Sequence, residues 1–155
     1  MVALFALAIL SLLATRALEN HQTLAWRERE AELLQVGTAY SAAIKMYYEQ
    51  APGTQKSYPR DLESLLLDAR AVRIRRPLRR LYRDPMTANA KWGLVRASDG
   101  GIMGVYSLSE RVPIKSGAFP ASLGDFAGAG SYRDWKFMYV PPGPAIGSHT
   151  IGEGK

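Results

Sequence analysis

The sequence contains no cysteine and has only two histidines in 155 residues. The lack of cysteine excludes disulfides, thiolate metal sites and cysteine nucleophiles, but it leaves the compartment open because a periplasmic protein need not contain disulfides. His21 and His149 are far apart in sequence and do not suggest a shared metal or catalytic site. No serine, histidine and acid grouping has a familiar spacing, and no phosphate-binding glycine loop precedes a helix. We therefore predict neither an enzyme nor a cofactor.

Charged side chains are absent from residues 1–14, whose only hydroxyl is that of Ser11. Three interpretations compete for this apolar run. A cleaved secretory signal needs a basic region before it, and only the α-amino group precedes this one. A conventional membrane span needs about 20 apolar residues, and a buried core helix would not explain the separate apolar stripe that follows. We favour a membrane segment, and we expect the chain as given to start a few residues inside it.

No proline interrupts residues 15–51, so the sequence predicts that one helix continues to the break at Pro52-Gly53. In the second part of this helix, apolar residues recur at spacings of three and four, which places them on one face. They are Leu33, Val36, Tyr40, Ala43, Ile44 and Tyr47. Such a stripe needs a surface to cover it, and we expect the later, strand-rich part of the chain to supply that surface.

Arginine is concentrated in one segment of the chain. Seven arginines fall within residues 70–83: Arg70, Arg73, Arg75, Arg76, Arg79, Arg80 and Arg83. With a net charge of +6, they suggest a patch for nucleic acid, anionic lipid or an acidic protein. Tyr82 alone interleaves them as a stacking aromatic, which weighs against nucleic acid and favours a solvated connector.

Residues 52–140 predict a small globular domain. A short leucine-rich helix is expected over residues 60–67, with acidic residues in its first turn. Three strands are then expected at 92–97, 101–108 and 135–140, and a Ser-Asp-Gly-Gly turn joins the first two as a hairpin. We expect the aromatic side chains of these strands to form the core rather than a ligand platform.

The fold class predicted from these segments is α+β. A long N-terminal helix, inserted in the membrane over its first half, packs on a small antiparallel sheet of about three strands. Residues 1–18 would form the transmembrane or filament-core helix and residues 19–51 its amphipathic continuation. Residues 52–140 would form the globular domain and residues 141–155 a flexible tail.

Residues 7–14 read LAILSLLA. They closely resemble the N-terminal helix of type IV pilin-like proteins, in particular the pseudopilins of type II secretion systems, whose helices read LAILGLLA there. In that family, a prepilin peptidase removes a short basic leader ending in glycine, and the aromatic residue that follows is N-methylated. The chain as given contains no such leader. The family also carries a glutamate near the start of its mature helix, where this sequence has Val2, and this difference argues against a major subunit more than against the family.

The order of later segments over residues 1–108 also resembles this family and implies a pilin-like fold. Asp84-Pro85 and Tyr106-Ser107-Leu108 match its motifs, whereas Trp92 stands seven residues after the proline instead of directly after it. Major pseudopilins then carry an acidic, glycine-rich calcium loop. Here residues 109–134 offer only Glu110, Asp125 and Asp134 among basic residues, while calcium takes six to eight oxygen ligands. We therefore predict no cofactor, with calcium as the one that this loop leaves open.

The resemblance implies a structural subunit of a type II secretion system, held by one helix in the bacterial inner membrane with its globular domain in the periplasm. Its partners would be the other pseudopilins of a short filament, the inner-membrane assembly platform and, where a leader precedes the chain, the prepilin peptidase. The side chains that would exchange lipid for neighbouring helices are Leu4, Phe5, Leu7, Ile9, Leu10, Leu12 and Leu13. Two alternatives remain. One is a minor pilin of a type IV pilus or DNA-uptake system whose arginines contact DNA, and the other is a membrane-tethered binding module independent of any filament.

Overall fold

The computed structural model describes residues 2–70, 74–120, 123 and 126–142, with the backbone alone for residues 2–20. The elements in chain order are α1 (Val2–Glu49), η1 (Glu63–Leu65), β1 (Gly93–Arg96), β2 (Ile102–Tyr106), η3 (Tyr132–Asp134) and β3 (Phe137–Met138), where η denotes a 3-10 helix. The strands form one antiparallel sheet in the order β1, β2, β3, and α1 packs on it. The predicted α+β class is confirmed.

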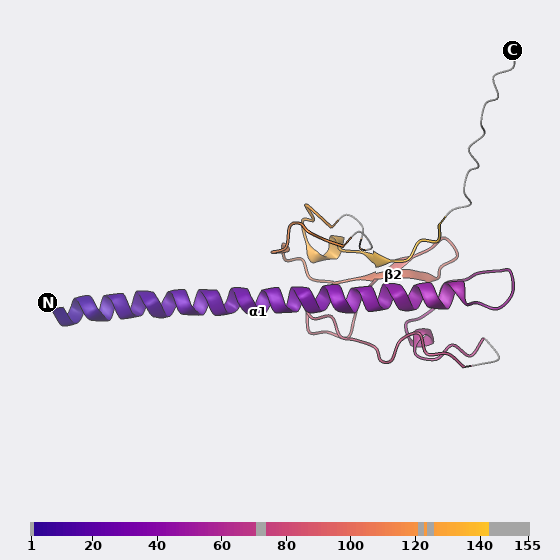
Figure 1. The fold of residues 1–155 in the computed structure, drawn as a ribbon, viewed down its shortest axis with the longest axis horizontal. Helices are drawn as coiled ribbons and strands as arrows, with labels where there is room; N and C mark the ends of the chain where they lie inside the picture. Colours follow the sequence, from indigo (N-terminus) through magenta and orange to yellow (C-terminus); the bar gives the residue numbers. More distant parts are fainter. Residues whose placement is uncertain (1, 71–73, 121–122, 124–125, 143–155) are drawn as a thin grey trace, which may run out of the picture.

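Helix α1 is continuous over 48 residues, which corresponds to a length of about 72 Å at about 1.5 Å per residue. Figure 1 shows that the globular domain gathers around the second half of this helix, while the first half projects from the domain. Glu30 is the first described residue of α1 whose side chain is buried. The sheet therefore covers only the part of the helix that carries the apolar stripe.

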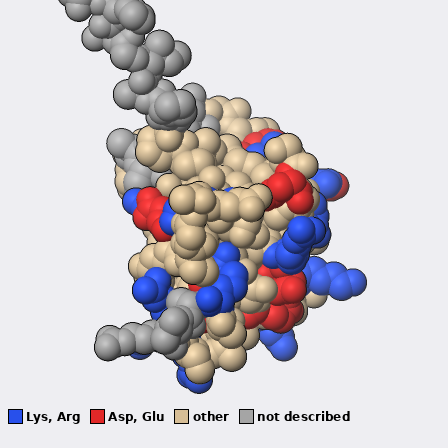
Figure 2. Space-filling view, turned by 90° about the vertical axis from the view of Figure 1, so that its right-hand side faces the viewer, with Lys and Arg blue, Asp and Glu red and all other residues tan. Residues whose placement is uncertain are grey.

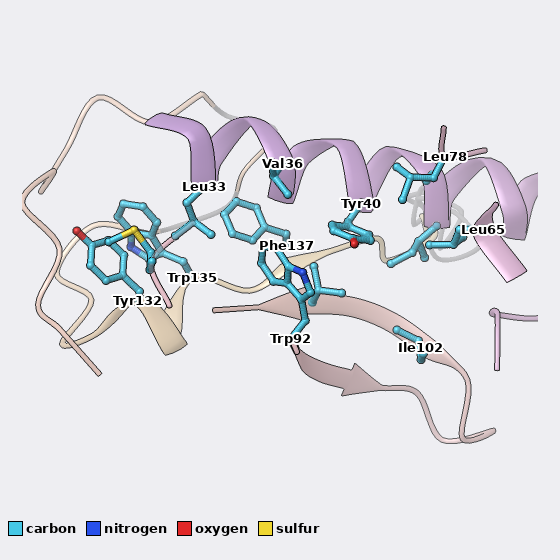
Figure 3. Packing of buried hydrophobic residues seen from close by; sticks show 14 of the residues in the cluster. Leu33, Val36, Tyr40, Leu65, Leu78, Trp92, Ile102, Tyr132, Trp135 and Phe137 are labelled. Carbon is cyan, nitrogen blue, oxygen red and sulfur yellow. The ribbon is translucent and has the colours of Figure 1, made fainter. Parts of the chain in front are cut away.

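The predicted stripe forms the helical side of the core. All six of its residues are buried, and Leu33, Tyr40 and Ile44 are fully so. Figure 3 shows the side chains of Leu33, Val36 and Tyr40 directed toward aromatic residues from the sheet side. The stripe is buried because the sheet presents an apolar face to it, as the periodicity predicted.

The sheet is short but well defined. Leu94 lies opposite Val105 in the β1–β2 hairpin, and Val105 lies opposite Phe137 in the β2–β3 pair. All three strands lie within the predicted ranges, although β3 contains only two residues. Val105 and Phe137 are buried between the sheet and α1. The close approach is possible because α1 has Gly37 beneath the Phe137 ring, where an added Cβ would lie 2.3 Å from Phe137 Cγ.

The leucine-rich segment after the long helix is less regular than predicted. It contains a single 3-10 turn, η1, rather than a helix over residues 60–67. Asp61 accepts hydrogen bonds from the backbone N–H and the hydroxyl of Ser64, which holds this turn. Leu65 is buried in the core, and its carbonyl accepts from the Leu78 N–H at 2.8 Å, so tertiary contacts favour the turn over a longer helix.

Two basic side chains from outside α1 satisfy the carbonyl groups at its C-terminal end. Lys56 Nζ donates to the Glu49 carbonyl at 2.7 Å and to the Ala51 carbonyl at 3.1 Å. Arg70 Nη2 donates to the Tyr47 carbonyl at 2.7 Å. Helix C-termini leave carbonyls without partners and favour positive charge, so both contacts stabilise the end of the helix.

Candidate functional site

The projecting part of α1 is the first candidate. The predicted lipid- or filament-facing residues, Leu4, Phe5, Leu7, Ile9, Leu10, Leu12 and Leu13, lie outside the residues whose side chains the structure describes. Among the described residues, no helix combines the length and apolar character that crossing a membrane requires. The backbone places residues 2–20 on the helix beyond the domain (Figure 1).

Arg70, the first member of the arginine segment, is part of the fold. Its guanidinium donates to both carboxylate oxygens of Asp68, at 2.8 and 2.9 Å, and lies 3.4 Å from the centre of the Tyr47 ring. The Asp68 side chain is 2% exposed. The hydrogen bond from Arg70 holds the pKa of the Asp68 carboxyl below its usual range. Arg70 therefore joins the loop to the end of α1 and is not free to bind an external anion.

The other arginines are separated along the surface. Arg75 donates to the Gln50 side chain at 2.8 Å, and its backbone pairs with that of Asp68, whereas Arg73 lies outside the described residues. Arg76, Arg79, Arg80 and Arg83 are exposed. The predicted patch of seven is thus divided between fold-supporting and exposed side chains.

Arg80 and Arg83 line an open hollow together with Arg29 from α1. Arg80 lies 5.0 Å from the centre of the Tyr82 ring and Arg29 lies 4.8 Å from that of Trp26. Within the part of the chain that the structure describes, no carboxylate forms an ion pair with these three arginines. The exposed Glu32 and the buried Asp84 also line this hollow. The three arginines outnumber these two carboxylates, so the hollow has a net positive charge.

The end of the domain at which α1 finishes has a different character. Figure 2 views this end and shows lysine and arginine side chains interspersed with aspartate and glutamate. A face of mixed sign attracts a charged partner less strongly than a face of one sign.

Glu30 fixes the loop after β2 to the helix. It is 4% exposed, and its Oε1 accepts hydrogen bonds from the backbone N–H groups of Ile114 and Lys115, both at 3.0 Å, and from the Tyr132 hydroxyl at 3.2 Å. Burial and the neighbouring Glu30 carboxylate raise the pKa of Tyr132 to about 12. This arrangement holds residues 111–115 beside the point where α1 leaves the domain.

Asp84 organises a second buried polar cluster. It is fully buried, and its carboxylate accepts from the Met86 N–H, the Thr87 hydroxyl, the Ser107 hydroxyl and the Leu108 N–H. The turn at Asp84-Pro85 is thereby tied to the residues that follow β2. With all four donors coming from the protein itself, the cluster is structural rather than a ligand site.

The acidic residues considered for calcium are not brought together. Glu110 pairs with Arg133 at 2.8 Å, and Asp134 accepts from the N–H and hydroxyl of Ser131 in a capping box. Asp125 lies outside the described residues. Among the residues described, no group of three acidic or histidine side chains is placed to hold a metal ion.

Glu30 and Gly37 were missed as members of the buried face, although the sequence carries a signal for both. Trp26, Glu30, Leu33, Gly37, Tyr40, Ile44 and Tyr47 follow one another at alternating spacings of four and three. A polar residue and a glycine thus occupy apolar positions of this stripe. Their partners, Tyr132 and Phe137, lie about one hundred residues away in sequence and cannot be assigned from the helix alone.

Comparisons of the chain with protein families, with curated proteins and with solved structures found no match.

Proposed function

We propose that this protein is a pseudopilin-like structural subunit of a bacterial type II secretion system, anchored in the inner membrane with its globular domain in the periplasm. The observation that carries the proposal is the division of α1. One continuous helix bears the uncharged residues 2–14 outside the domain and a buried apolar stripe inside it. A helix of this kind can leave a bilayer and pack on neighbouring helices without changing its own fold.

The relation between two sequence motifs adds support. Asp84-Pro85 and Tyr106-Ser107-Leu108 carry much of the resemblance to pseudopilins in the globular domain. In the structure, the Asp84 carboxylate accepts from Ser107 and Leu108. A common packing requirement therefore accounts for the joint presence of the two motifs.

The test is a charge in the apolar run. We expect Leu10→Asp to abolish incorporation into filaments, because an ionised side chain is costly both in lipid and in a helix-packed filament core. Subunit cross-linking in native membranes and export of the secreted proteins are the measurements. Gln22→Asp places the same charge at an exposed position of α1 and should leave both unchanged. Normal filament assembly with Leu10→Asp would overturn the proposal.

The mature N-terminus provides a second test. Mass spectrometry of protein from native membranes should show a methylated aromatic residue upstream of Met1, because the family is processed there by a prepilin peptidase. A mature chain that starts just after Ala14 or Ala17 would instead indicate an ordinary signal peptide.

A minor pilin that contacts DNA is the second candidate, and the exposed Arg76, Arg79, Arg80 and Arg83 favour it. Binding to duplex DNA should then weaken steeply as salt rises. Neutralising Arg79 and Arg80 should reduce the salt slope by about 1 for each of them that binds a phosphate group. Absence of salt-sensitive binding would remove this candidate.

A further inference from the structure

Trp26 marks the level at which α1 leaves the domain toward its N-terminus. The Arg111 guanidinium lies 3.8 Å from the centre of the Trp26 ring, and the Arg29 guanidinium lies 4.8 Å from it. Trp26 is half-buried, whereas residues 21–24 before it are exposed. The indole is therefore covered by cationic groups at the edge of the domain.

The loop that Glu30 fixes completes this edge. Val112 is 71% exposed and Ile114 is 41% exposed, although both are aliphatic. Arg27 and Lys115 line a shallow groove beside Glu30, between α1 and this loop. Figure 1 shows the orange segment around residue 112 at the end of the domain that is nearest the projecting half of the helix.

We name this edge the collar and define it by Trp26, Arg27, Arg29, Arg111, Val112 and Lys115. Within the described part of the chain, no acidic side chain forms an ion pair with its four cations. Glu30 is buried and already accepts three hydrogen bonds. Glu28 and Glu110 are exposed beside the collar, and Glu110 pairs with Arg133, so the four cations still give this edge a net positive charge. A tryptophan, an exposed aliphatic residue and unpaired cations on one edge are the groups that suit a membrane surface.

We propose that the collar is a second membrane contact, which lies on anionic lipid headgroups and orients the globular domain on the bilayer that holds α1. This inference rests on the proposed function, because it requires the start of α1 to be inserted in the membrane. The positive charge of the collar favours anionic lipid as its partner. The collar adjoins the part of α1 that follows the proposed membrane segment, so it would lie near the bilayer surface.

The spacing along α1 fits this contact. Trp26 lies eight positions after Leu18, where the predicted membrane segment ends, which corresponds to about 12 Å along the helix. The headgroup layer is about 5–8 Å thick and the Debye length about 8 Å, so the collar lies within electrostatic reach of the surface. Helical side chains lean toward the N-terminus, which directs Arg27 and Arg29 to the bilayer.

The absence of cysteine allows a single-label test on the full chain. Val112→Cys is labelled with a nitroxide, and Ser98→Cys, an exposed position in the β1–β2 turn, is the matched control. Both are reconstituted in vesicles of phosphatidylcholine alone and in an equimolar mixture with phosphatidylglycerol. The readout is the accessibility of the nitroxide to a water-soluble paramagnetic relaxant, and flotation checks vesicle binding.

We expect the label at residue 112 to lose accessibility only in the phosphatidylglycerol vesicles, whereas the label at residue 98 stays accessible in both. Replacing Arg111 and Lys115 with glutamine should reduce the ratio of docked to undocked domain by about 25-fold, because each basic residue near such a surface contributes about fivefold. Replacing Arg76 and Arg79 with glutamine removes the same charge outside the collar and should leave the ratio unchanged.

The outcomes separate this inference from the proposed function. If the chain floats with both vesicles and the label at residue 112 is equally accessible in both, the collar contact is refuted while membrane anchoring stands. Equal protection in both vesicles would also refute recognition of anionic headgroups. If the chain does not float with either vesicle, membrane anchoring fails and the collar contact fails with it.

Discussion

The Ser107 hydroxyl donates a hydrogen bond to the Asp84 carboxylate at 2.8 Å, in a site where both side chains are fully buried. The contact joins the turn after the arginine segment to the end of β2, across 23 residues of sequence. Because three further donors converge on the same carboxylate, Asp84 determines where the arginine segment ends relative to the sheet.

We expect Asp84→Asn to destabilise the domain by about 2–3 kcal/mol. An amide has one acceptor oxygen in place of two, so at least one buried donor loses its partner. Denaturant unfolding of the full chain in mild detergent, followed by tryptophan fluorescence, measures the effect. Asp99→Asn is the control, because Asp99 is exposed and, among the described residues, accepts one hydrogen bond, from the Gly101 N–H. The free energy of unfolding of this variant should change by about 0.5 kcal/mol or less.

Gly37 is expected to tolerate no larger side chain. A Cβ at this position would lie 2.3 Å from Phe137 Cγ, and Phe137 is 2% exposed, so the ring has little room to move. Gly37→Ala should lower the free energy of unfolding by about 1–3 kcal/mol, even though alanine favours the helix by about 1 kcal/mol. The measurement is again denaturant unfolding in detergent.

Gly117→Ala supplies the comparison for this substitution, because an added Cβ there meets nothing within 4 Å. A smaller side chain at residue 137 should partly rescue Gly37→Ala, so the double variant with Phe137→Leu should be less destabilised than the sum of the two single variants. Strict additivity would show that the alanine methyl and the ring do not clash.

The sequence predicts what depends on local periodicity. The stripe that contains Leu33, Tyr40 and Ile44 is buried as expected, because spacings of three and four fix a helical face before any partner is known. The hairpin between β1 and β2 was predicted for a similar reason, since its turn residues adjoin both strands.

What the sequence did not predict depends on contacts between distant segments. Arg70 looked like one of seven equivalent arginines, yet Asp68 and the end of α1 use it within the fold. The role of Glu30 depends on Tyr132, which lies 102 residues away. Neither the Asp68–Arg70 pair nor the Glu30–Tyr132 contact follows from composition or spacing. The structure was therefore needed to distinguish the cations that support the fold from those that are exposed on the surface.

The Asp68–Arg70 pair should make the stability of the domain dependent on acid. Because the pKa of Asp68 is lowered in the folded state, the pair contributes fully above about pH 4, the ordinary value for aspartate. Its contribution is lost as pH falls through the folded-state pKa. We expect Asp68→Asn to cost about 1–3 kcal/mol at neutral pH and to flatten the acid limb of the unfolding free energy.

Unfolding curves collected from neutral to acidic pH measure this dependence, with Asp99→Asn as the comparison at an exposed position. Asp99 accepts a hydrogen bond from the Gly101 N–H, and among the described residues it forms no ion pair. An acid limb of the same slope in Asp68→Asn and in the unmodified protein would show that the pair does not produce the dependence.

The final prediction concerns Tyr132, whose pKa of about 12 is raised first by burial and then by the Glu30 carboxylate. Glu30→Gln removes the charge but keeps an acceptor oxygen, so the pKa of Tyr132 should fall and remain above the ordinary value of about 10, since burial persists. The raised pKa means that the neutral phenol stabilises the fold fully below about pH 10 and that this contribution is lost as pH rises toward 12. NMR titration of ring-labelled tyrosine, assigned with Tyr132→Phe, measures the shift. Glu28→Gln changes an exposed glutamate two residues earlier and should leave the pKa of Tyr132 unchanged. An unchanged pKa of Tyr132 in Glu30→Gln would contradict the role given to Glu30.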